Sequence, residues 1–361
     1  MAQRRSRNFL NIAISLLVGL GIGTVIGGGA VYFYKSRPPR VDTHLKILTH
    51  VDAIPKNILD KFLATEKMQI RQDITKSNSE LLEKLNDSSH EYDLVILQSW
   101  QVPTFIDSQL LMPIKKPSIS NLRYIAADFK HLPHDNDLNY SVPFGWGVNG
   151  IAYNKKRFSN KPVSWNTLLK EKELLSKIAF LPDPRELMAG LIRRHAIDNQ
   201  DMNNSNSNTY MQAFEQVLPF AKNSPKKSLK ALGQGELWAA ELSSGMVSVL
   251  MSHSDDFHFV VPEESASLWT LSLSLCRGSS KLKEAHKFID FIISKDSALE
   301  IARSQLIATP LVSLEYENIH PSLKPSFIRS LPLNRLQVIE PVSQMAKQWE
   351  TTVIEKTTPL N

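Results

Sequence analysis

The chain contains very little cysteine. Cys276 is the single cysteine among 361 residues, so neither a disulfide framework nor a zinc site built from thiolates is available. Its neighbours Leu273 and Leu275 are apolar, which predicts a buried and chemically inert thiol. Exported proteins without disulfides and many cytosolic proteins are equally poor in cysteine. This absence therefore does not locate the protein in the cell.

Motifs of catalysis and of cofactor binding are also missing. The histidines form two close pairs, His131/His134 and His253/His258, but no H-E-x-x-H motif accompanies either pair. Residues 243–245, Ser-Ser-Gly, lack the flanking glycines of a G-x-S-x-G elbow. No phosphate loop of the type G-x-x-x-x-G-K occurs. We therefore predict no metal, no cofactor and no enzymatic activity.

Clustered positive charge is absent, although the net charge is +6. The lysines and arginines are spread along the chain and form no basic stripe of the kind that binds phosphate backbones. We interpret the charge as solvated surface and predict no nucleic-acid partner.

The N-terminus contains a long uncharged stretch, residues 9–34. A membrane-spanning helix needs about 20 such residues, and the arginines at positions 4, 5 and 7 favour a cytoplasmic N-terminus. We predict an uncleaved transmembrane anchor, because the stretch is longer than the core of a typical signal peptide. The small residues at 28–30 leave signal cleavage open as an alternative.

Short apolar strands alternate with helix-period segments in the rest of the chain. Strands are expected near residues 45–48, 70–74, 92–97, 178–181, 257–261 and 271–275, and helices near 58–63, 79–85 and 185–196. The continuous apolar run Leu94-Val95-Ile96-Leu97 is typical of a buried strand. This alternation predicts an α/β fold. The length favours two lobes, because single domains cluster near roughly 100–200 residues.

Three segments, taken in order, carry a family resemblance. They are Tyr92-Asp93-Leu94-Val95 with Gln98-Ser99-Trp100, Tyr140-Ser141-Val142-Pro143-Phe144-Gly145-Trp146-Gly147, and Gly235-Glu236-Leu237 through Val260-Val261-Pro262-Glu263-Glu264 to Trp269 and Ser272. Their order and spacing resemble the spermidine/putrescine-binding family of periplasmic proteins over most of residues 45–315. Thr309-Pro310 fits the next turn of that family.

The resemblance implies a two-lobed type 2 periplasmic-binding-protein fold with a central cleft, as found in solute-binding proteins of ABC transporters. Residues 1–40 would hold the cytoplasmic tip, the anchor and a linker. Residues 41–143 plus 271–316 would form lobe 1, and residues 144–270 plus 317–361 would form lobe 2. The expected ligand is a small organic cation of polyamine type. The expected partner is an ABC transporter permease, met in the periplasm or at the outer face of the cytoplasmic membrane.

The resemblance also implies the ligand-binding residues, which are Asp183, Glu186, Trp269, Trp100, Gln98 and Ser99. The two acidic residues match those with which the family holds an amine, and Trp269 matches a tryptophan that stacks on the alkyl chain. Carboxylates pair with ammonium groups, and aromatic faces cover methylenes by cation–π and apolar contact.

Several positions depart from the family pattern. Leu271 stands where the family has an aspartate that pairs with an internal amine, and Ser243 and Ile307 replace a tryptophan and a tyrosine. Asp52 or Glu241 are candidate substitutes for the missing carboxylate. These departures leave a second function open, in which the anchored domain has a lost or altered ligand site and acts as an interaction or sensory module.

The candidate residues also have purely structural interpretations. Asp183 and Glu186 follow a predicted strand and precede a predicted helix, so they can form a capping box around Pro184. Trp269 and Trp100 can be ordinary core residues, which is the commoner role of tryptophan. The sequence alone leaves both interpretations open.

Overall fold

The computed structural model describes residues 44–312, except 89–90, 163, 172, 184–185, 188–189, 191–216, 222–223 and 264–265, together with residues 336–338. The chain divides into two compact units, Met1–His44 and Leu45–Asn361. The predicted anchor at residues 9–34 lies outside the described residues, as does most of the predicted helix at 185–196. Within the described ranges, no helix is long and apolar enough to cross a membrane.

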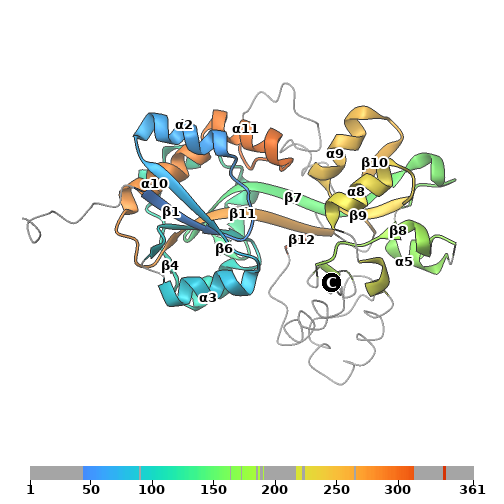
Figure 1. The fold of residues 1–361 in the computed structure, drawn as a ribbon, viewed down its shortest axis with the longest axis horizontal. Helices are drawn as coiled ribbons and strands as arrows, with labels where there is room; N and C mark the ends of the chain where they lie inside the picture. Colours follow the sequence, from blue (N-terminus) through green and yellow to red (C-terminus); the bar gives the residue numbers. More distant parts are fainter. Residues whose placement is uncertain are drawn as a thin grey trace, which may run out of the picture. The chain divides into compact units, whose positions relative to one another are not determined.

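Strands and helices alternate along the chain as the sequence pattern predicted (Figure 1). The strands are β1 (His44–Thr49), β2 (Gln69–Ile74), β3 (Leu94–Gln98), β4 (Leu111–Met112), β5 (His131–Leu132), β6 (Asp135–Asn136), β7 (Ser141–Asn154), β8 (Ile178–Ala179), β9 (Ala239–Ser243), β10 (Phe257–Val260), β11 (Ala266–Cys276) and β12 (Leu336–Val338). The α-helices are α2 (Lys56–Glu66), α3 (Asn78–Ser88), α4 (Val102–Asp107), α5 (Trp165–Lys170), α8 (Pro225–Gly233), α9 (Ser244–His253), α10 (Leu282–Ile292) and α11 (Lys295–Gln305).

One mixed sheet runs through the described domain, in the order β2-β1-β3-β11-β7-β9-β8. β1 and β3 are parallel, whereas β11 is antiparallel to both β3 and β7. β10 also pairs with β7, and β4 and β12 also pair with β11. The mixed sheet with helices between its strands confirms the predicted α/β class.

Helices cover both faces of the β1–β3–β11 part of the sheet. Along β3, Leu94 and Ile96 belong to one apolar core and Val95 and Leu97 to another, because successive side chains of a strand point to opposite faces. Residues of α2, α10 and α11 complete the first core, and residues of α3 and α4 complete the second. Figure 1 shows α2 and α11 on one side of these strands and α3 on the other.

A second pair of cores lies around β8, β9 and the far half of β7. Trp165 and Leu168 of α5 pack with Ile151 and Phe180 in one of them. Leu232 of α8 and Val247 of α9 belong to the other, together with Ala152 and Ala240 of the sheet. The alternation of Ile151 and Ala152 along β7 separates these two faces.

Two long strands connect the two pairs of cores. β7 is 14 residues long, and its first half pairs with β11 from Ser141 to Val148. Its second half pairs with β9 from Asn149 to Tyr153. Pro143 lies on β7 and Leu271 lies on β11, so the expected lobe boundaries at residues 143 and 271 fall on these two strands. The lobe boundaries and a hinge movement about these strands stay predictions.

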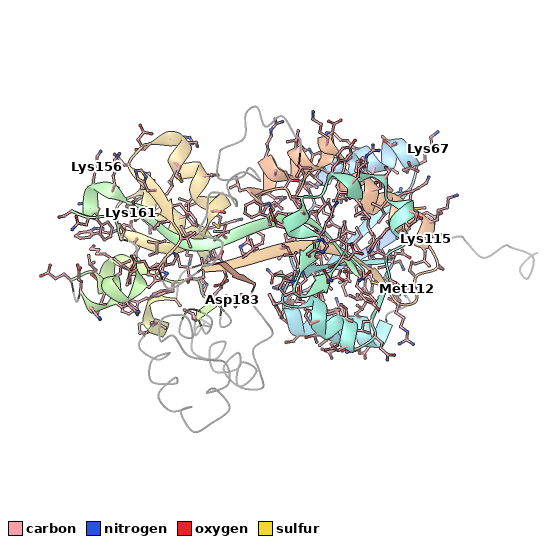
Figure 2. The ribbon with its side chains drawn as sticks, turned by 180° about the vertical axis from the view of Figure 1, so that it is seen from behind. Lys67, Met112, Lys115, Lys156, Lys161 and Asp183 are labelled. Atoms are coloured by element: carbon pink, nitrogen blue, oxygen red, sulfur yellow. The ribbon has the colours of Figure 1, made fainter. Side chains whose placement is uncertain are left out.

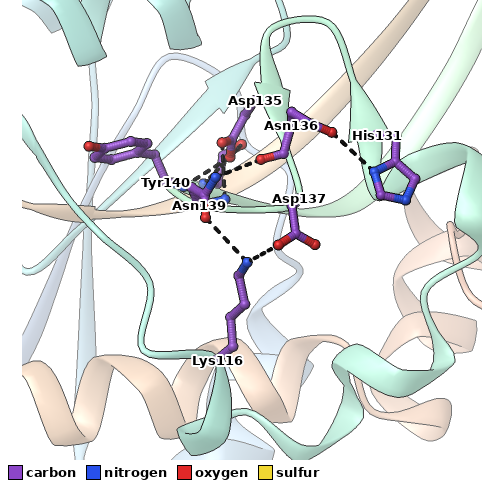
Figure 3. Close-up of polar contacts among 8 residues, drawn as sticks. Lys116, His131, Asp135, Asn136, Asp137, Asn139 and Tyr140 are labelled. Carbon is purple, nitrogen blue, oxygen red and sulfur yellow. Dashed lines mark hydrogen bonds and ion pairs between the residues drawn. The ribbon is translucent and has the colours of Figure 1, made fainter.

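A turn held by a buried carboxylate leads the chain into β7 (Figure 3). Asp135 is only 6% exposed. One of its oxygens accepts a hydrogen bond from the Asn139 amide at 3.0 Å. The other accepts from the amides of Tyr140 and Ser141 at 3.0 and 2.7 Å and from the Ser141 hydroxyl at 2.8 Å. Asp135 thus fixes where β7 begins.

The exposed side of the same turn carries an ion pair. Lys116 Nζ lies 2.6 Å from Asp137 and 3.2 Å from the side-chain oxygen of Asn139. Asp137 has a left-handed backbone with φ of 64°, a conformation that aspartate and asparagine tolerate better than most residues. Pairing with Lys116 lowers the pKa of the Asp137 carboxyl.

His134, next to this turn, predicts an acid-sensitive contribution to stability. Burial lowers its pKa from 6.5 to about 4, against a smaller opposing effect of Asp135, and its Nδ1 has no hydrogen-bond partner among the described residues. In the unfolded chain His134 is therefore protonated below about pH 6.5, whereas in the folded protein it is protonated only below about pH 4. Stability should fall as the pH drops through this window. His134→Gln should reduce the loss of melting temperature between pH 7 and 4.5, and an unchanged loss would contradict this assignment.

The remaining sequence predictions about polar surface and cysteine agree with the structure. Lys67, Lys115, Lys156 and Lys161 are exposed and project from the periphery in Figure 2, as expected of solvated charge. Cys276 is fully buried. Burial, with a smaller effect of Asp93, raises the pKa of its thiol well above the ordinary value, as expected of an inert core thiol.

Candidate functional site

Strand pairing places two of the six predicted site residues, Gln98 and Trp269, on one face of the sheet. Three rows of paired residues follow each other along β3, β11, β7 and β9. The rows are Gln98–Leu271–Gly145, Trp269–Gly147 and Asn149–Ser243. Because paired residues point the same way and side chains alternate along a strand, all of these side chains lie on one face. We call it the crossing face.

Glu186 reaches this face from a separate segment of the chain. It follows β8 and is 3% exposed. Its Oε1 accepts a hydrogen bond from Asn149 Nδ2 at 2.6 Å, and its Oε2 accepts one from the Ser267 hydroxyl at 2.8 Å. A buried carboxylate is thus bound to both long strands, since Asn149 belongs to β7 and Ser267 to β11.

The indole of Trp269 lies against β7. Its Nε1 donates a hydrogen bond to Asn149 Oδ1 at 3.0 Å. Its six-membered ring lies so close to Gly147 that a Cβ there would stand 2.3 Å from Cζ2. The absence of a side chain at Gly147 is therefore what allows the ring to lie along the strand. Trp269 is half-buried, and Asn149 joins it directly to Glu186.

Asp183 begins the helical turn that carries Glu186. Its Oδ1 accepts a hydrogen bond from the Glu186 amide at 3.4 Å, and its carbonyl accepts one from the Leu187 amide at 3.0 Å. This is the geometry of a helix N-cap, as the capping interpretation expected. The Glu186 carboxylate binds Asn149 and Ser267 on the sheet. Figure 2 shows Asp183 at the level of the two long strands.

The residues at the end of β3 divide between the two faces of the sheet. Trp100 Nε1 donates to Gln98 Oε1 at 2.8 Å, which joins Trp100 to the crossing face. Ser99 is fully buried. Its amide donates to the Thr270 carbonyl at 3.0 Å, and its hydroxyl accepts from the Thr270 amide at 3.4 Å. These contacts make Ser99 a link between β3 and β11.

Comparison with known protein families gives a match to this chain. A model of the bacterial extracellular solute-binding proteins matches residues 89–333. The chain belongs to this family. The chain is also similar to spermidine/putrescine-binding periplasmic protein 1 of Haemophilus influenzae, with 24% identity over 285 residues that cover 76% of this chain and 77% of that protein.

Two further comparisons extend the family relation. The chain is similar to a norspermidine sensor of Vibrio cholerae, with 24% identity over 246 residues, 62% of this chain and 66% of that protein. The solved spermidine/putrescine ABC transporter substrate-binding protein of Streptococcus pneumoniae has a TM-score of 0.68 and 19% identity. That comparison covers 87% of this chain and 98% of the other. This chain thus has the mixed α/β fold of periplasmic binding proteins.

Two of the three departures from the family pattern, Leu271 and Ile307, make the middle of the crossing face apolar. Leu271 is 6% exposed and Ile307 is 8% exposed. The Ile307 side chain covers Gly145, where a Cβ would stand 2.4 Å from its Cδ1. This solute-binding protein therefore presents hydrocarbon between the Trp269 end and the Gln98 end of the face.

The two candidate substitutes for the missing aspartate differ in position. Asp52 is exposed and follows β1. Glu241 is 5% exposed, lies two residues before Ser243 on β9 and accepts a hydrogen bond from the Leu181 amide at 3.3 Å. Alternation along β9 places Glu241 on the crossing face with Ser243.

Sequence reasoning missed Asn149 and Ser267. Neither belongs to a local motif, and their partners are distant, since Asn149 and Ser267 are 37 and 81 positions from Glu186. The only available signal was indirect. Asn149 and Ser267 are polar residues on strands that are almost entirely buried, and buried polar side chains generally have hydrogen-bond partners.

Proposed function

We propose that this chain binds a small organic cation of polyamine type on the crossing face and presents it to the permease of an ABC transporter. The observation that carries the proposal is the buried Glu186 carboxylate joined through Asn149 to the indole of Trp269. A carboxylate beside an aromatic ring provides both attractions that an alkylammonium group requires. Membership of the solute-binding family and the polyamines after which its relatives are named support the same ligand class.

The proposed ligand-binding residues are Asp183, Glu186, Trp269, Trp100, Gln98 and Ser99. Glu186 would hold an ammonium group, and Trp269 would cover the adjoining methylenes. Leu271 and Ile307 would add apolar contact along the chain, since both line the middle of the crossing face. A binding protein of this type needs matched groups and a change of shape on binding, and it needs no nucleophile or proton shuttle.

A second candidate is a membrane-anchored sensory or interaction module on the same fold. The similarity to a norspermidine sensor favours it, as do the departures at Leu271, Ser243 and Ile307. If the ligand site is lost, no small molecule should stabilise the protein.

Ligand-dependent thermal stabilisation tests the proposal. A ligand that binds only the folded state adds RT ln(1 + [L]/Kd), which is about 2.7 kcal/mol at 100 times Kd. Putrescine, cadaverine and agmatine should raise the melting temperature, whereas sugars and acidic amino acids should not. If no cation raises it at millimolar concentration, the lost-site alternative replaces the transport function.

We predict that putrescine binds more tightly than spermidine. Leu271 offers no charge at the middle of the crossing face, so the internal amine of spermidine would be left unpaired in a poorly hydrated site. Calorimetry with both ligands checks the order. Leu271→Asp should shift it toward spermidine, and tighter binding of spermidine by the unaltered protein would overturn this prediction without touching the fold.

We further propose that residues 9–34 anchor the protein at the outer face of the cytoplasmic membrane. The uncharged length of the segment supports this proposal. After alkaline carbonate extraction of native membranes, the full-length protein should stay in the pellet, and a variant lacking residues 9–34 should not. A released, shortened protein that begins near Val31 would show signal cleavage instead.

A further inference from the structure

Asn149 occupies a central position in the sheet, and its side chain is held by hydrogen bonds to two other residues. It lies on β7 between β11 and β9, with Ser243 as its pairing partner, and it is 8% exposed. Its amide group contacts Trp269 on one side and Glu186 on the other. These two partners are 83 positions apart in the sequence, and this one side chain joins them.

The direction of the hydrogen bonds follows from the indole. The Nε1–H of tryptophan can only donate, so the Asn149 oxygen must face Trp269 and the Asn149 NH₂ must face Glu186. A flipped amide would set NH₂ against N–H on one side and oxygen against carboxylate oxygen on the other. Glu186 is thereby required to accept, and the Ser267 hydroxyl gives its second oxygen another donor.

We propose that Asn149 is a positioning residue. Because its oxygen accepts from Trp269, its NH₂ group must donate to Glu186, and this fixed direction, which we call the polarity of the Asn149 amide, orients the Glu186 carboxylate for a cation. The proposal rests on the proposed function for its ligand class. The Asn149 amide and the Ser267 hydroxyl are neutral donors, so these two bonds orient the Glu186 carboxylate without cancelling its charge. An oriented anion beside an indole fixed over Gly147 selects against anionic ligands and favours alkylammonium groups.

The polarity can be tested without any ligand. Asn149→Asp keeps the shape and the acceptor for Trp269, but it sets two carboxyl groups against each other. At pH 8 the variant should melt below the unaltered protein. The deficit should shrink as the pH falls to 5.5, because one shared proton restores a donor toward Glu186. Asn149→Leu, which has similar shape and no polar group, removes one donor to Glu186 but adds no charge, so its deficit should change less with pH than that of Asn149→Asp.

The remaining acids near the site do not confuse this comparison. Asp183 and Glu241 lie on the neighbouring segments and are unchanged in every variant, so the comparison concerns the group at position 149. A deficit of Asn149→Asp that runs parallel to that of Asn149→Leu would overturn the proposal. Melting of Asn149→Asp at the temperature of the unaltered protein at pH 8 would overturn it equally.

Ligand affinity supplies the second measurement. In calorimetry at pH 7.5, Asn149→Leu should weaken putrescine binding at least tenfold. The matched control is Asn154→Leu at the other end of β7, where the asparagine side chain accepts a hydrogen bond from the Lys156 amide. The control should bind within twofold of the unaltered protein, and equal losses in both variants would reduce Asn149 to a general packing role.

The two measurements separate the two proposals. If the unaltered protein binds no putrescine, the proposed function fails, while the pH dependence of Asn149→Asp still decides whether the polarity exists. If Asn149→Leu does not fold, the pH dependence of Asn149→Asp against the unaltered protein still tests the direction of the hydrogen bonds, because the aspartate side chain has the size of asparagine.

Discussion

Asp135→Ala is expected to lower the free energy of unfolding by about 3 kcal/mol or more. The substitution leaves three backbone amides and the Ser141 hydroxyl without the carboxylate that now binds them. Each buried donor left without a partner costs roughly 1–3 kcal/mol, and water can replace the carboxylate only at the exposed side of the turn. Urea denaturation followed by far-ultraviolet circular dichroism measures the loss.

Asp137 is the matched control for this experiment. It lies two residues away in the same turn, but its side chain is 63% exposed and its partner is Lys116. Exposed ion pairs contribute about 0–1 kcal/mol. Asp137→Asn preserves a residue that tolerates the left-handed backbone, so its cost should stay below about 1 kcal/mol. A control variant as unstable as Asp135→Ala would show that the ion pair, and not the buried carboxylate, holds the turn.

The fold of the domain was largely predictable because its signals are local. The apolar run from Leu94 to Leu97 predicts a buried strand without reference to any other segment, and β3 occupies residues 94–98. The length of β11 was not predictable in the same way. The prediction began at Leu271, whereas the strand begins at Ala266. Ser267 and Thr270 interrupt the apolar pattern, and they become strand residues through pairing with β12 and β7.

The candidate site was predictable where the residues are close in sequence. Asp183 and Glu186 are three residues apart, and their capping contact follows from that spacing. The contact of Asn149 with Trp269 joins residues 120 positions apart. It depends on the register between β7 and β11, and a shift of one residue would turn Asn149 to the other face. No local pattern contains that register.

Glu186→Gln is expected to weaken binding of putrescine by about 2–5 kcal/mol, the usual effect of removing one partner of a buried, hydrogen-bonded charge pair. Stability should change far less. The new amide oxygen can still accept from Asn149 Nδ2, and the Ser267 hydroxyl can rotate to accept from the new NH₂ group. The substitution thus removes the charge and retains the neighbouring hydrogen bonds.

Two further variants decide how this result is interpreted. Asp183→Ala removes an N-cap and should cost about 1 kcal/mol of stability. If Asp183 also contacts the ligand, its affinity loss should exceed that amount. Glu236→Gln, at an exposed position before β9, should change neither quantity. Melting temperature and calorimetric affinity are measured on the same preparations. If Glu186→Gln binds putrescine as tightly as the unaltered protein, the buried carboxylate is a structural group that joins β7 to β11, and the cation must bind elsewhere.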